Sequence, residues 1–458
     1  MMPRNIAVVL SGGVGSRLGL GTPKQFFKVA GKTVLEHTLD AFEQNAYVSE
    51  ICIVSNPYFL SDVETLVLRG GYKKVKKILK GGKERYDSSL SAIRAYEGQD
   101  VNLLFHDAVR PLVSQRIIDD VCVALEHHEA IDVVLPAVDT IIEAESNYIS
   151  NIPERARLRR GQTPQAFHLS VIAEAYRRAL QDEKLSVTDD CGVVVRYMPE
   201  IPVFLVRGEE SNMKLTYKED TYLLDKLFQL HSTTAPQTIP DNKAFTGKVA
   251  VVFGGSYGIG KTLCQMLTAT GAEVVSLSRS TTSTDVGKRE DVAKALAEAA
   301  QHYGRIDYCI VAAGVLHKEP LISMDYATIV SDVETNLLGT IHVALEAHPY
   351  LQQTHGKLLF FTSSSYTRGR AFYSIYSSTK AAIVNFCQAI AAEWEPDGIA
   401  VNCINPERTN TPMRRSNFGI EPPETLLTPE AVATAAINTL LGTYTGQVID
   451  VKRLNKNL

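Results

Sequence analysis

The sequence lacks the paired cysteines that would mark a disulfide framework or a zinc site. Its seven cysteines form an odd, scattered set, no two of them have C-x-x-C spacing, and most lie within apolar runs. Long hydrophobic segments are missing too, and the N-terminus passes straight into an apolar strand-like segment at 6–10 without the apolar region of a signal peptide. These absences predict buried free thiols in a reducing cytoplasm and no membrane partner.

A large excess of charge of either sign is also missing. The net charge is -4, with 45% hydrophobic and 21% charged residues, as in an ordinary globular protein. The densest basic run, at 73–77 with Lys80, is typical of a solvated face or a strand edge. The composition therefore predicts no nucleic-acid partner.

The length of 458 residues allows two or three domains. The best linker candidate is 231–245, which is polar, carries two prolines and lacks periodicity. It divides the chain into predicted domains at 1–230 and 246–458, and the helical spacing at 220–230 predicts a helix that closes the first domain.

Both halves alternate short apolar strands with amphipathic helices. Strands are predicted at 6–10, 50–55, 101–106, 131–136, 248–253, 272–277, 306–311, 357–362 and 399–404. Strands that are apolar throughout and separated by helices indicate a parallel sheet covered on both faces. The predicted fold class is α/β, with two doubly wound, mainly parallel, Rossmann-like domains.

A glycine-rich loop, SGGVGSR at 11–17, joins the first strand to the first helix. Glycines let backbone amides approach a triphosphate, and a helix N-terminus favours negative charge. Arg17 and Lys24 add positive charge where an attack on an α-phosphate would need it. Asp107 ends the strand at 101–106, at the sheet edge where ligands bind in parallel sheets, and could hold Mg²⁺ with the phosphates. A ligand-free tight turn and a capping role for Asp107 are the alternatives.

Together these residues resemble the methylerythritol-phosphate and ribitol-phosphate cytidylyltransferase family over nearly all of 4–228. The matching positions are Gly12, Gly13, Arg17, 23–25, 35–37, Gly81, Gly82, Arg85, Ser88, 106–111, Asp139, Thr140, 162–165, Thr188, Asp189 and 212–216.

The resemblance implies that Arg17, Lys24 and Lys214 bind and activate the CTP phosphates and that Asp107 serves the metal. It implies that the nucleotide is bound by Gly12, Gly13, Gly82, Arg85 and Ser88, with Ser88 near the cytosine and ribose. The sugar phosphate would be received by Asp139, Thr140, Arg155, Thr163 and Thr188. Arg157, Arg159 or Arg160 could take the place of Arg155 in this role. Alternatively, these arginines are solvated and have no role in binding.

A second glycine loop, GGSYGIG at 254–260, follows the strand at 248–253 and opens a helix. This context predicts a dinucleotide site with the pyrophosphate at the helix N-terminus. Arg279 ends the next strand, where an acidic residue would bind a ribose 2′-hydroxyl and an arginine suits a 2′-phosphate. The position therefore favours NADPH, with an ordinary loop cation as the alternative.

Tyr376 and Lys380 lie four residues apart, on one face of a helix. A nearby ammonium is expected to lower the pKa of the phenol, which helps it to exchange a proton with a carbonyl oxygen. The serines at 363–365 follow the strand at 357–362 and supply a hydroxyl thirteen positions before the tyrosine.

This half resembles the short-chain dehydrogenase/reductase family over essentially all of 246–452. The resemblance implies Tyr376 as general acid, Lys380 on the nicotinamide ribose, a serine that orients the carbonyl (Ser363, or Ser364 as the alternative), and Asn336 holding a relay water. The implied cofactor residues are Gly254, Ser256, Tyr257, Gly258, Ile259, Gly260, Arg279, Asp285, Ala313 and Gly314, with Asp285 expected after a third strand. Phe253, Ala312-Ala313 and Glu407 depart from the family pattern, and Glu407 is expected to alter the nicotinamide pocket.

The joined resemblances imply two consecutive reactions. Ribulose 5-phosphate would be reduced with NADPH to ribitol 5-phosphate, which would be condensed with CTP to CDP-ribitol and pyrophosphate, for capsule or cell-surface polysaccharide synthesis. The alternatives are another acceptor such as methylerythritol phosphate, an unrelated ketone reductase, and a non-catalytic nucleotide sensor. Both families imply a homo-oligomer, a tetramer or a dimer, with an arm near 139–165 that completes a neighbouring transferase site.

Overall fold

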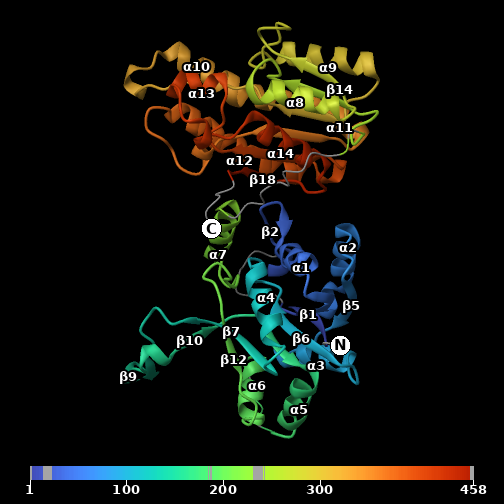
Figure 1. The fold of residues 1–458 in the computed structure, drawn as a ribbon, viewed down its shortest axis with the longest axis vertical. Coiled ribbons are helices and arrows are strands. Elements are labelled where there is room, and N and C mark those ends of the chain that lie inside the picture. The colour runs from blue at the N-terminus through green and yellow to red at the C-terminus, as the bar shows by residue number, and fades with distance from the viewer. Residues whose placement is uncertain are drawn as a thin grey trace. The chain divides into compact units, whose positions relative to one another are not determined.

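The computed structural model describes residues 3–13, 23–183, 185, 188–230, 241 and 243–453. The chain divides into two compact units, residues 1–228 and 229–458, each of which is described by itself (Figure 1). Most of the predicted linker, 231–240 and 242, lies outside the described residues. No described helix is long and apolar enough to cross a membrane.

The first unit is built on one eight-stranded sheet. Its strands run in the order β10-β7-β11-β6-β1-β4-β5, and β12 pairs with β7. Strands β5, β4, β1 and β6 are mutually parallel, whereas β11 runs antiparallel to β6 and β7. The strands are β1 (Arg4–Ser11), β4 (Val48–Ser55), β5 (Val75–Lys80), β6 (Val101–Asp107), β7 (Ala130–Pro136), β10 (Arg159–Gly161), β11 (Gln165–His168) and β12 (Phe204–Arg207).

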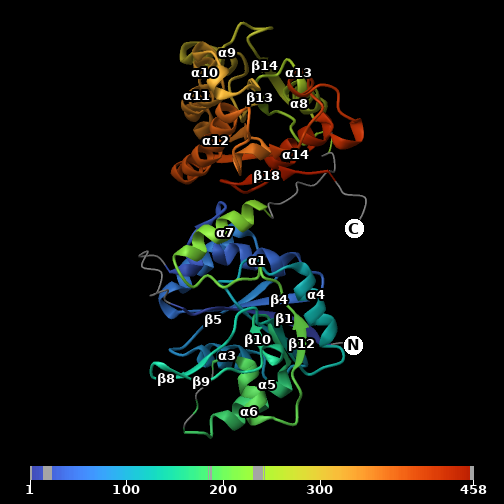
Figure 2. The ribbon, with the colours of Figure 1, turned by 90° about the vertical axis from the view of Figure 1, so that its left-hand side faces the viewer.

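Each face of this sheet carries its own hydrophobic core, because successive strand side chains point to opposite faces. Along β1, Ile6 and Val8 pack on one side, and Ala7 and Val9 pack on the other. The first core contains α3 (Arg85–Ala95), α5 (Leu169–Ala179) and α6 (Asp190–Tyr197). The second contains α1 (Val34–Gln44), α2 (Leu60–Gly70) and α4 (Gln115–Ala124) (Figure 2).

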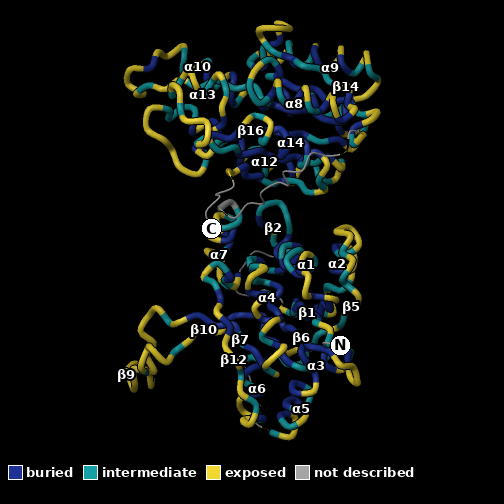
Figure 3. The backbone as a smooth tube through the Cα atoms, viewed as in Figure 1, coloured by how far each residue is buried: buried dark blue, intermediate teal, exposed yellow. Residues whose placement is uncertain are grey.

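An extended arm, residues 137–158, leaves the sheet between β7 and β10 (Figure 1). It contains the short antiparallel pair β8 (Glu143–Glu145) and β9 (Tyr148–Asn151). The arm is exposed along nearly its whole length (Figure 3), including apolar side chains such as Tyr148 and Ile149, which are 80% and 61% exposed. Exposed apolar side chains on a projecting segment are typical of interaction surfaces.

The second unit has a six-stranded sheet that is parallel throughout, in the order β14-β13-β15-β16-β17-β18. One face packs against α8 (Gly258–Ala269) and α14 (Pro429–Leu441). The other packs against α9 (Arg289–Tyr303), α11 (Gly339–Thr354) and α12 (Ser374–Glu393). The strands are β13 (Val249–Phe253), β14 (Glu273–Leu277), β15 (Tyr308–Val311), β16 (Lys357–Phe361), β17 (Ala400–Pro406) and β18 (Val448–Val451).

The nine predicted strands and the closing helix, α7 (Glu219–Leu230), are all present. The strand expected before Asp285 is wrong: among the described residues, 278–288 form turns and loop between β14 and α9. That segment is rich in serine and threonine, whose hydroxyls bond to one another and to the backbone in place of a sheet neighbour. All seven cysteines are free and buried, as predicted.

Candidate active sites

The first unit has a pocket at the carboxyl ends of β1 and β6. Eight of the residues expected to bind CTP or its metal line it: Gly12, Gly13, Lys24, Gly82, Arg85, Ser88, Asp107 and Lys214. A Cβ atom on Gly12 would lie 3.2 Å from the Ser88 hydroxyl, so the loop packs closely against α3. Arg17 lies outside the described residues. The fold therefore brings together sequence segments that are up to about 200 residues apart.

Asp107 is the central charge of this pocket. Its Oδ2 atom lies 2.9 Å from Lys214 Nζ and 3.3 Å from Arg110 Nε. Burial works to raise the pKa of Asp107, but Lys214, Arg85 and Arg110 outweigh it and hold this pKa well below its usual range. Among the described residues, no group donates to Oδ1. Asp107 is thus a fixed carboxylate with one oxygen available to a cation.

Lys24 is held at the rim of the same pocket by main-chain carbonyls. Its Nζ atom donates to Thr216 O at 2.6 Å and to Leu215 O at 3.4 Å. These carbonyls belong to the segment that carries Lys214. Two ammonium groups are therefore presented to one pocket, which suits a triphosphate.

Arg85 is positioned from behind by a buried carboxylate. Its Nη1 atom lies 2.5 Å from Asp190 Oδ2, and the Tyr176 hydroxyl donates to Asp190 Oδ1 at 2.7 Å. Burial works against the charge of Arg85, but the attraction of Asp190 and Asp107, together with the hydrogen bond to Asp190, outweighs it and raises the pKa of the guanidinium. Arg85 thus stays charged and fixed at the pocket.

The residues expected to bind the sugar phosphate are not gathered in this way. Asp139, Thr140 and Arg155 lie on the exposed arm, and Thr188 is exposed elsewhere. Thr163 is buried, and its hydroxyl accepts from Asp107 N at 3.2 Å and lies 2.9 Å from His106 Nδ1. Thr163 is thus tied to the CTP pocket through the main chain of Asp107.

Two adjoining hollows lie at the carboxyl ends of the strands of the second unit. The first, the dinucleotide hollow, is lined by Gly254, Ser256, Tyr257, Gly258, Ile259, Gly260, Arg279, Ala313 and Gly314, all predicted cofactor residues, and also by Thr284, Val286, Thr335, Thr411 and Met413. Gly254 has φ +89°, and a Cβ atom there would clash with the main chain of Ala312 and Ala313. Only glycine fits this turn.

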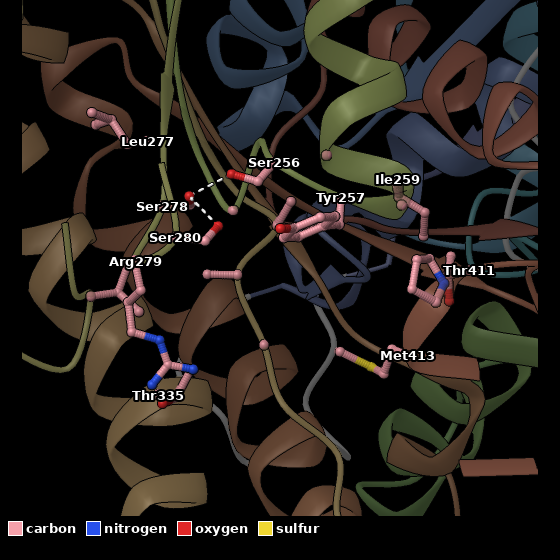
Figure 4. Close-up of a pocket in the computed structure, with 18 of the residues that line it drawn as sticks. Ser256, Tyr257, Ile259, Leu277, Ser278, Arg279, Ser280, Thr335, Thr411 and Met413 are labelled. Carbon is pink, nitrogen blue, oxygen red and sulfur yellow. Dashed lines mark hydrogen bonds between the residues drawn. The ribbon is translucent and has the colours of Figure 1, made fainter. Parts of the chain in front are cut away.

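Hydroxyl groups cluster around Ser278, which directly precedes Arg279 in the chain. Ser278 contacts Ser256 and lies 3.2 Å from Ser280 and 2.8 Å from Thr281, oxygen to oxygen. Figure 4 shows Ser278 between Ser256 and Ser280, with the Arg279 side chain extending from the same loop. The loop thus carries a guanidinium and several hydroxyl groups that line the same hollow, and both kinds of group can donate to a phosphate.

Asp285 does not line the dinucleotide hollow, although Thr284 and Val286 on either side of it do. Its carboxylate accepts from Gly287 N at 3.0 Å. Asp285 therefore shapes the loop that presents its neighbours, and its contact with the cofactor stays a prediction.

The second hollow, the catalytic hollow, contains Tyr376, Lys380 and Ser363 to Ser365. Burial raises the pKa of Tyr376 to about 12, while a hydrogen bond with Ser363 and the charge of Arg414 act to lower it. Burial lowers the pKa of Lys380 to about 8, and its Nζ donates to Phe361 O at 2.9 Å. The expected lowering of the tyrosine pKa by Lys380 is not found, because burial dominates both groups.

Asn336 is buried in a short π-helix, Glu334–Leu338. Its side chain donates to Val315 O and accepts from Val315 N, both at 2.9 Å. These paired bonds fix the chain just after Gly314, which lines both hollows. π-bulges of this kind are frequent at functional sites.

The family departures are accommodated in different ways. Phe253 is buried in the core below the glycine loop. Glu407 lines the catalytic hollow, but its Oε2 atom accepts from Arg453 N at 3.1 Å, so its carboxylate is drawn toward the C-terminal segment.

Two arginines that line pockets, Arg110 and Arg414, were not assigned a role from the sequence. Arg110 lies in the HDAVRP motif at 106–111, which matches the cytidylyltransferase family, so this motif could have identified Arg110 from the sequence.

Each of the two units matches a known protein family. Residues 5–229 match the family described as 2-C-methyl-D-erythritol 4-phosphate cytidylyltransferase, and residues 248–419 match short chain dehydrogenase. The bifunctional ribulose 5-phosphate reductase/CDP-ribitol pyrophosphorylase Bcs1 of Haemophilus influenzae is 46% identical over 458 residues, covering 98% of this chain and 96% of that protein. The chain belongs to this bifunctional family.

Relatives of the first half alone are found as well. The 2-C-methyl-D-erythritol 4-phosphate cytidylyltransferase of Thermobifida fusca is 44% identical over 50% of this chain and 94% of its own length. The ribitol-5-phosphate cytidylyltransferase of Lactiplantibacillus plantarum is 33% identical over 49% of this chain and 99% of its own length. The predicted fold class and the prediction of an enzyme with cytidylyltransferase and reductase halves are confirmed, and the reductase half is of the NAD(P)H-using type.

Proposed function

We propose that the second unit reduces ribulose 5-phosphate to ribitol 5-phosphate and that the first unit condenses the product with CTP, giving CDP-ribitol and pyrophosphate. The similarity to the Haemophilus influenzae protein over nearly the full length of both chains is the observation that carries this proposal. The two steps fit chemically, because reduction of the pentulose ketone yields the pentitol phosphate that the transferase accepts. The product would serve capsule or cell-surface polysaccharide synthesis in the cytoplasm, where the seven thiols stay reduced.

In the transferase, Lys24 and Lys214 bind the triphosphate and stabilise the charge that develops at its α-phosphate, together with Arg17. Asp107 offers one available carboxylate oxygen to the pocket, which Glu84 also lines, and this fits Mg²⁺, since this ion usually takes one or two carboxylates and completes its shell with phosphates and water. Mg²⁺ supplies further charge neutralisation when bound. The phosphate of the sugar substrate is the nucleophile, and it displaces pyrophosphate from the α-phosphorus.

In the reductase, Tyr376 donates its hydroxyl proton to the ketone oxygen as the ketone becomes an alcohol, and Ser363 holds that oxygen by a hydrogen bond. The raised tyrosine pKa keeps the phenol protonated at neutral pH. The nicotinamide, when bound, supplies a hydride to the carbonyl carbon. Lys380 binds the nicotinamide ribose, and Asn336 supports the proton path that restores the phenol.

The cofactor is proposed to be NADPH. Arg279 and the hydroxyls around Ser278 offer a cation and several donors to a 2′-phosphate. No carboxylate lines the dinucleotide hollow among the described residues. A ribose 2′-hydroxyl therefore lacks its usual acidic partner there.

The domain limits are proposed as 1–230 and 246–458, and the protein as a homo-oligomer, a tetramer or a dimer. The arm carries Asp139, Thr140 and Arg155 away from the CTP pocket of its own chain, and its apolar side chains are exposed. We therefore expect these three residues to enter the CTP pocket of a partner chain. Closed symmetry gives a dimer if the arm and the reductase interface share one axis, and a tetramer if they do not.

The decisive experiment incubates the full chain with ribulose 5-phosphate, NADPH, CTP and Mg²⁺ and identifies the products by mass spectrometry. CDP-ribitol and pyrophosphate are expected, and omission of NADPH should stop their formation unless ribitol 5-phosphate is supplied. The similarity to the Thermobifida fusca enzyme makes methylerythritol phosphate the second candidate acceptor. A higher kcat/KM for methylerythritol phosphate than for ribitol 5-phosphate would overturn the proposed transferase substrate.

A further inference from the structure

The catalytic hollow of the reductase contains a cation that the reduction chemistry leaves unused. Arg414 lies on the short helix α13 (Pro412–Phe418) and lines this hollow together with Tyr376 and Ser363. Its side chain is only 20% exposed. Its charge acts on the Tyr376 phenol, so the guanidinium lies near the reacting group without contacting it.

Contacts on two sides hold the Arg414 guanidinium in place. Its Nε and Nη2 atoms donate to the two carboxylate oxygens of Glu421, at 2.6 and 2.8 Å. Its central carbon lies 3.7 Å from the centre of the Phe418 ring, a stacked cation–π contact. Among the described residues, Nη1 has no hydrogen-bond acceptor. Phe418 therefore fixes one face of the guanidinium and Glu421 fixes one edge. The Nη1 edge keeps N–H donors that a ligand can use.

Glu421 is also approached by a second arginine. Arg408 Nη1 lies 3.9 Å from Glu421 Oε1, and Arg408 lines the same hollow with a side chain that is 61% exposed. The two guanidinium groups thus share one carboxylate. The other carboxylate lining the hollow, Glu407, pairs with Arg453, so an excess positive charge is left at the Arg414 end. An excess of positive charge in a partly enclosed pocket favours an anion.

We propose that Arg414, assisted by Arg408, binds the phosphate group of the sugar phosphate that the reductase half reduces. This inference rests on the proposed function, because it assigns the phosphate of that substrate to a subsite. With the ketone oxygen at Tyr376 and Ser363, the phosphate at the far end of the chain must lie elsewhere in the same hollow. Arg414 and Arg408 are the cations lining it besides Lys380, which is buried beside the phenol.

The chemistry of the two partners supports this assignment. A guanidinium presents planar paired donors that match phosphate oxygens, and it keeps its charge at every working pH. A phosphate dianion carries more charge than the single Glu421 carboxylate, so it can add to the free edge of Arg414 and draw Arg408 inward. Glu421 then serves to hold Arg414 in the orientation that the substrate meets.

The test compares a phosphorylated and an unphosphorylated substrate in the full chain. Arg414→Gln should lower kcat/KM for ribulose 5-phosphate by about 30-fold to 100-fold, the loss expected for a charge-assisted hydrogen-bonding pair. It should change kcat/KM for ribulose by no more than about 3-fold, because ribulose lacks the group that Arg414 contacts. Arg415→Gln, on the same helix but outside the hollow, is the matched control and should leave both values unchanged.

A purely structural role for Arg414 makes a different prediction. In that case Arg414→Gln and Glu421→Gln, which both break the pair, should lower activity on both substrates alike. Under the present proposal Glu421→Gln keeps the cation and so keeps the preference for the phosphorylated substrate. Equal losses for ribulose and ribulose 5-phosphate in Arg414→Gln would overturn the phosphate subsite.

Binding gives a second measurement that does not depend on turnover. Calorimetric titration of ribitol 5-phosphate into the wild-type protein saturated with NADPH, a pair that cannot react, should show NADPH-dependent binding that is clearly tighter than that of ribitol, and Arg414→Gln should remove most of that difference. An unchanged difference in the variant contradicts the subsite. A wild-type protein that oxidises no NADPH with ribulose 5-phosphate would instead contradict the proposed function, so the two failures are distinguishable.

Discussion

Arg85 Nη1 and Asp190 Oδ2 lie 2.5 Å apart, and the Asp190 side chain has no exposure to solvent. The Tyr176 hydroxyl completes this cluster at 2.7 Å from Asp190 Oδ1. A residue of the CTP pocket is therefore fixed by a buried ion pair between α3 and the start of α6.

Replacement of Asp190 by Asn should destabilise the first unit by about 3 kcal/mol, because it leaves the partly buried Arg85 charge without its partner. Hydrogen exchange of the full chain in a urea series should show earlier opening of α3 and α6. Glu200→Gln, which removes an exposed ion pair with Arg178, is the control and should leave exchange unchanged. Equal protection in Asp190→Asn and wild type would show that the pair contributes nothing to stability.

The two activities should be separable by single substitutions. Tyr376→Phe removes the proton donor and should abolish NADPH oxidation, while pyrophosphate release from CTP and supplied ribitol 5-phosphate continues. Lys24→Ala should do the reverse, because its ammonium belongs to the other pocket. Spectrophotometry and a coupled pyrophosphate assay measure both. Loss of both activities from one substitution in a folded protein would show that the sites depend on each other.

Replacement of Arg279 by Asp should reverse the cofactor preference. The loss of charge-assisted bonds to a 2′-phosphate should lower kcat/KM for NADPH by about 30-fold, and the new carboxylate should improve the use of NADH. Arg289→Gln, which removes an exposed arginine paired with Glu346, is the matched control. A wild-type enzyme that uses NADH as well as NADPH would contradict the proposed role of Arg279.

Reductase kcat/KM should fall as the pH rises above about 8. Burial lowers the pKa of Lys380 to about 8 in the free chain, so this ammonium is charged below that pH and neutral above it. Tyr376, whose pKa is about 12, stays protonated over the whole range and is not the group that limits activity. Because kcat/KM reports the free enzyme, the profile should show one alkaline limb near pH 8.

The Lys380→Arg variant tests the source of that limb. A guanidinium keeps its charge at alkaline pH, so whatever activity the variant retains should stay level up to pH 10. Transferase activity measured in the same buffers controls for general damage to the protein. A wild-type profile without a fall between pH 7.5 and 10 excludes Lys380 as the titrating group.

Arm residues should act on a neighbouring chain. Mixing an inactive Lys24→Ala chain with an inactive Arg155→Ala chain should restore part of the transferase activity, because one intact composite site can form. Light scattering should show an oligomer at micromolar concentration. No recovery after confirmed subunit exchange would mean that each site is built from one chain.

The sequence by itself determined the two sheets and the positions of both glycine loops. The strands at 6–10 and 249–253 are continuously apolar because both of their faces are buried, and this pattern is readable without a structure. Strands of three or four residues, such as β10 and β12, were missed because so short a segment has no periodicity of its own.

Only the tertiary structure decided which charged residues share a pocket and what state they adopt. It placed Lys214 against Asp107, and Arg414 beside the hollow of Tyr376, across separations that no local pattern spans. It also reversed the expected direction of the Tyr376 pKa, because burial is set by the whole fold. Strand and loop patterns are local properties of the chain, whereas electrostatic partners and desolvation arise only when distant segments pack together.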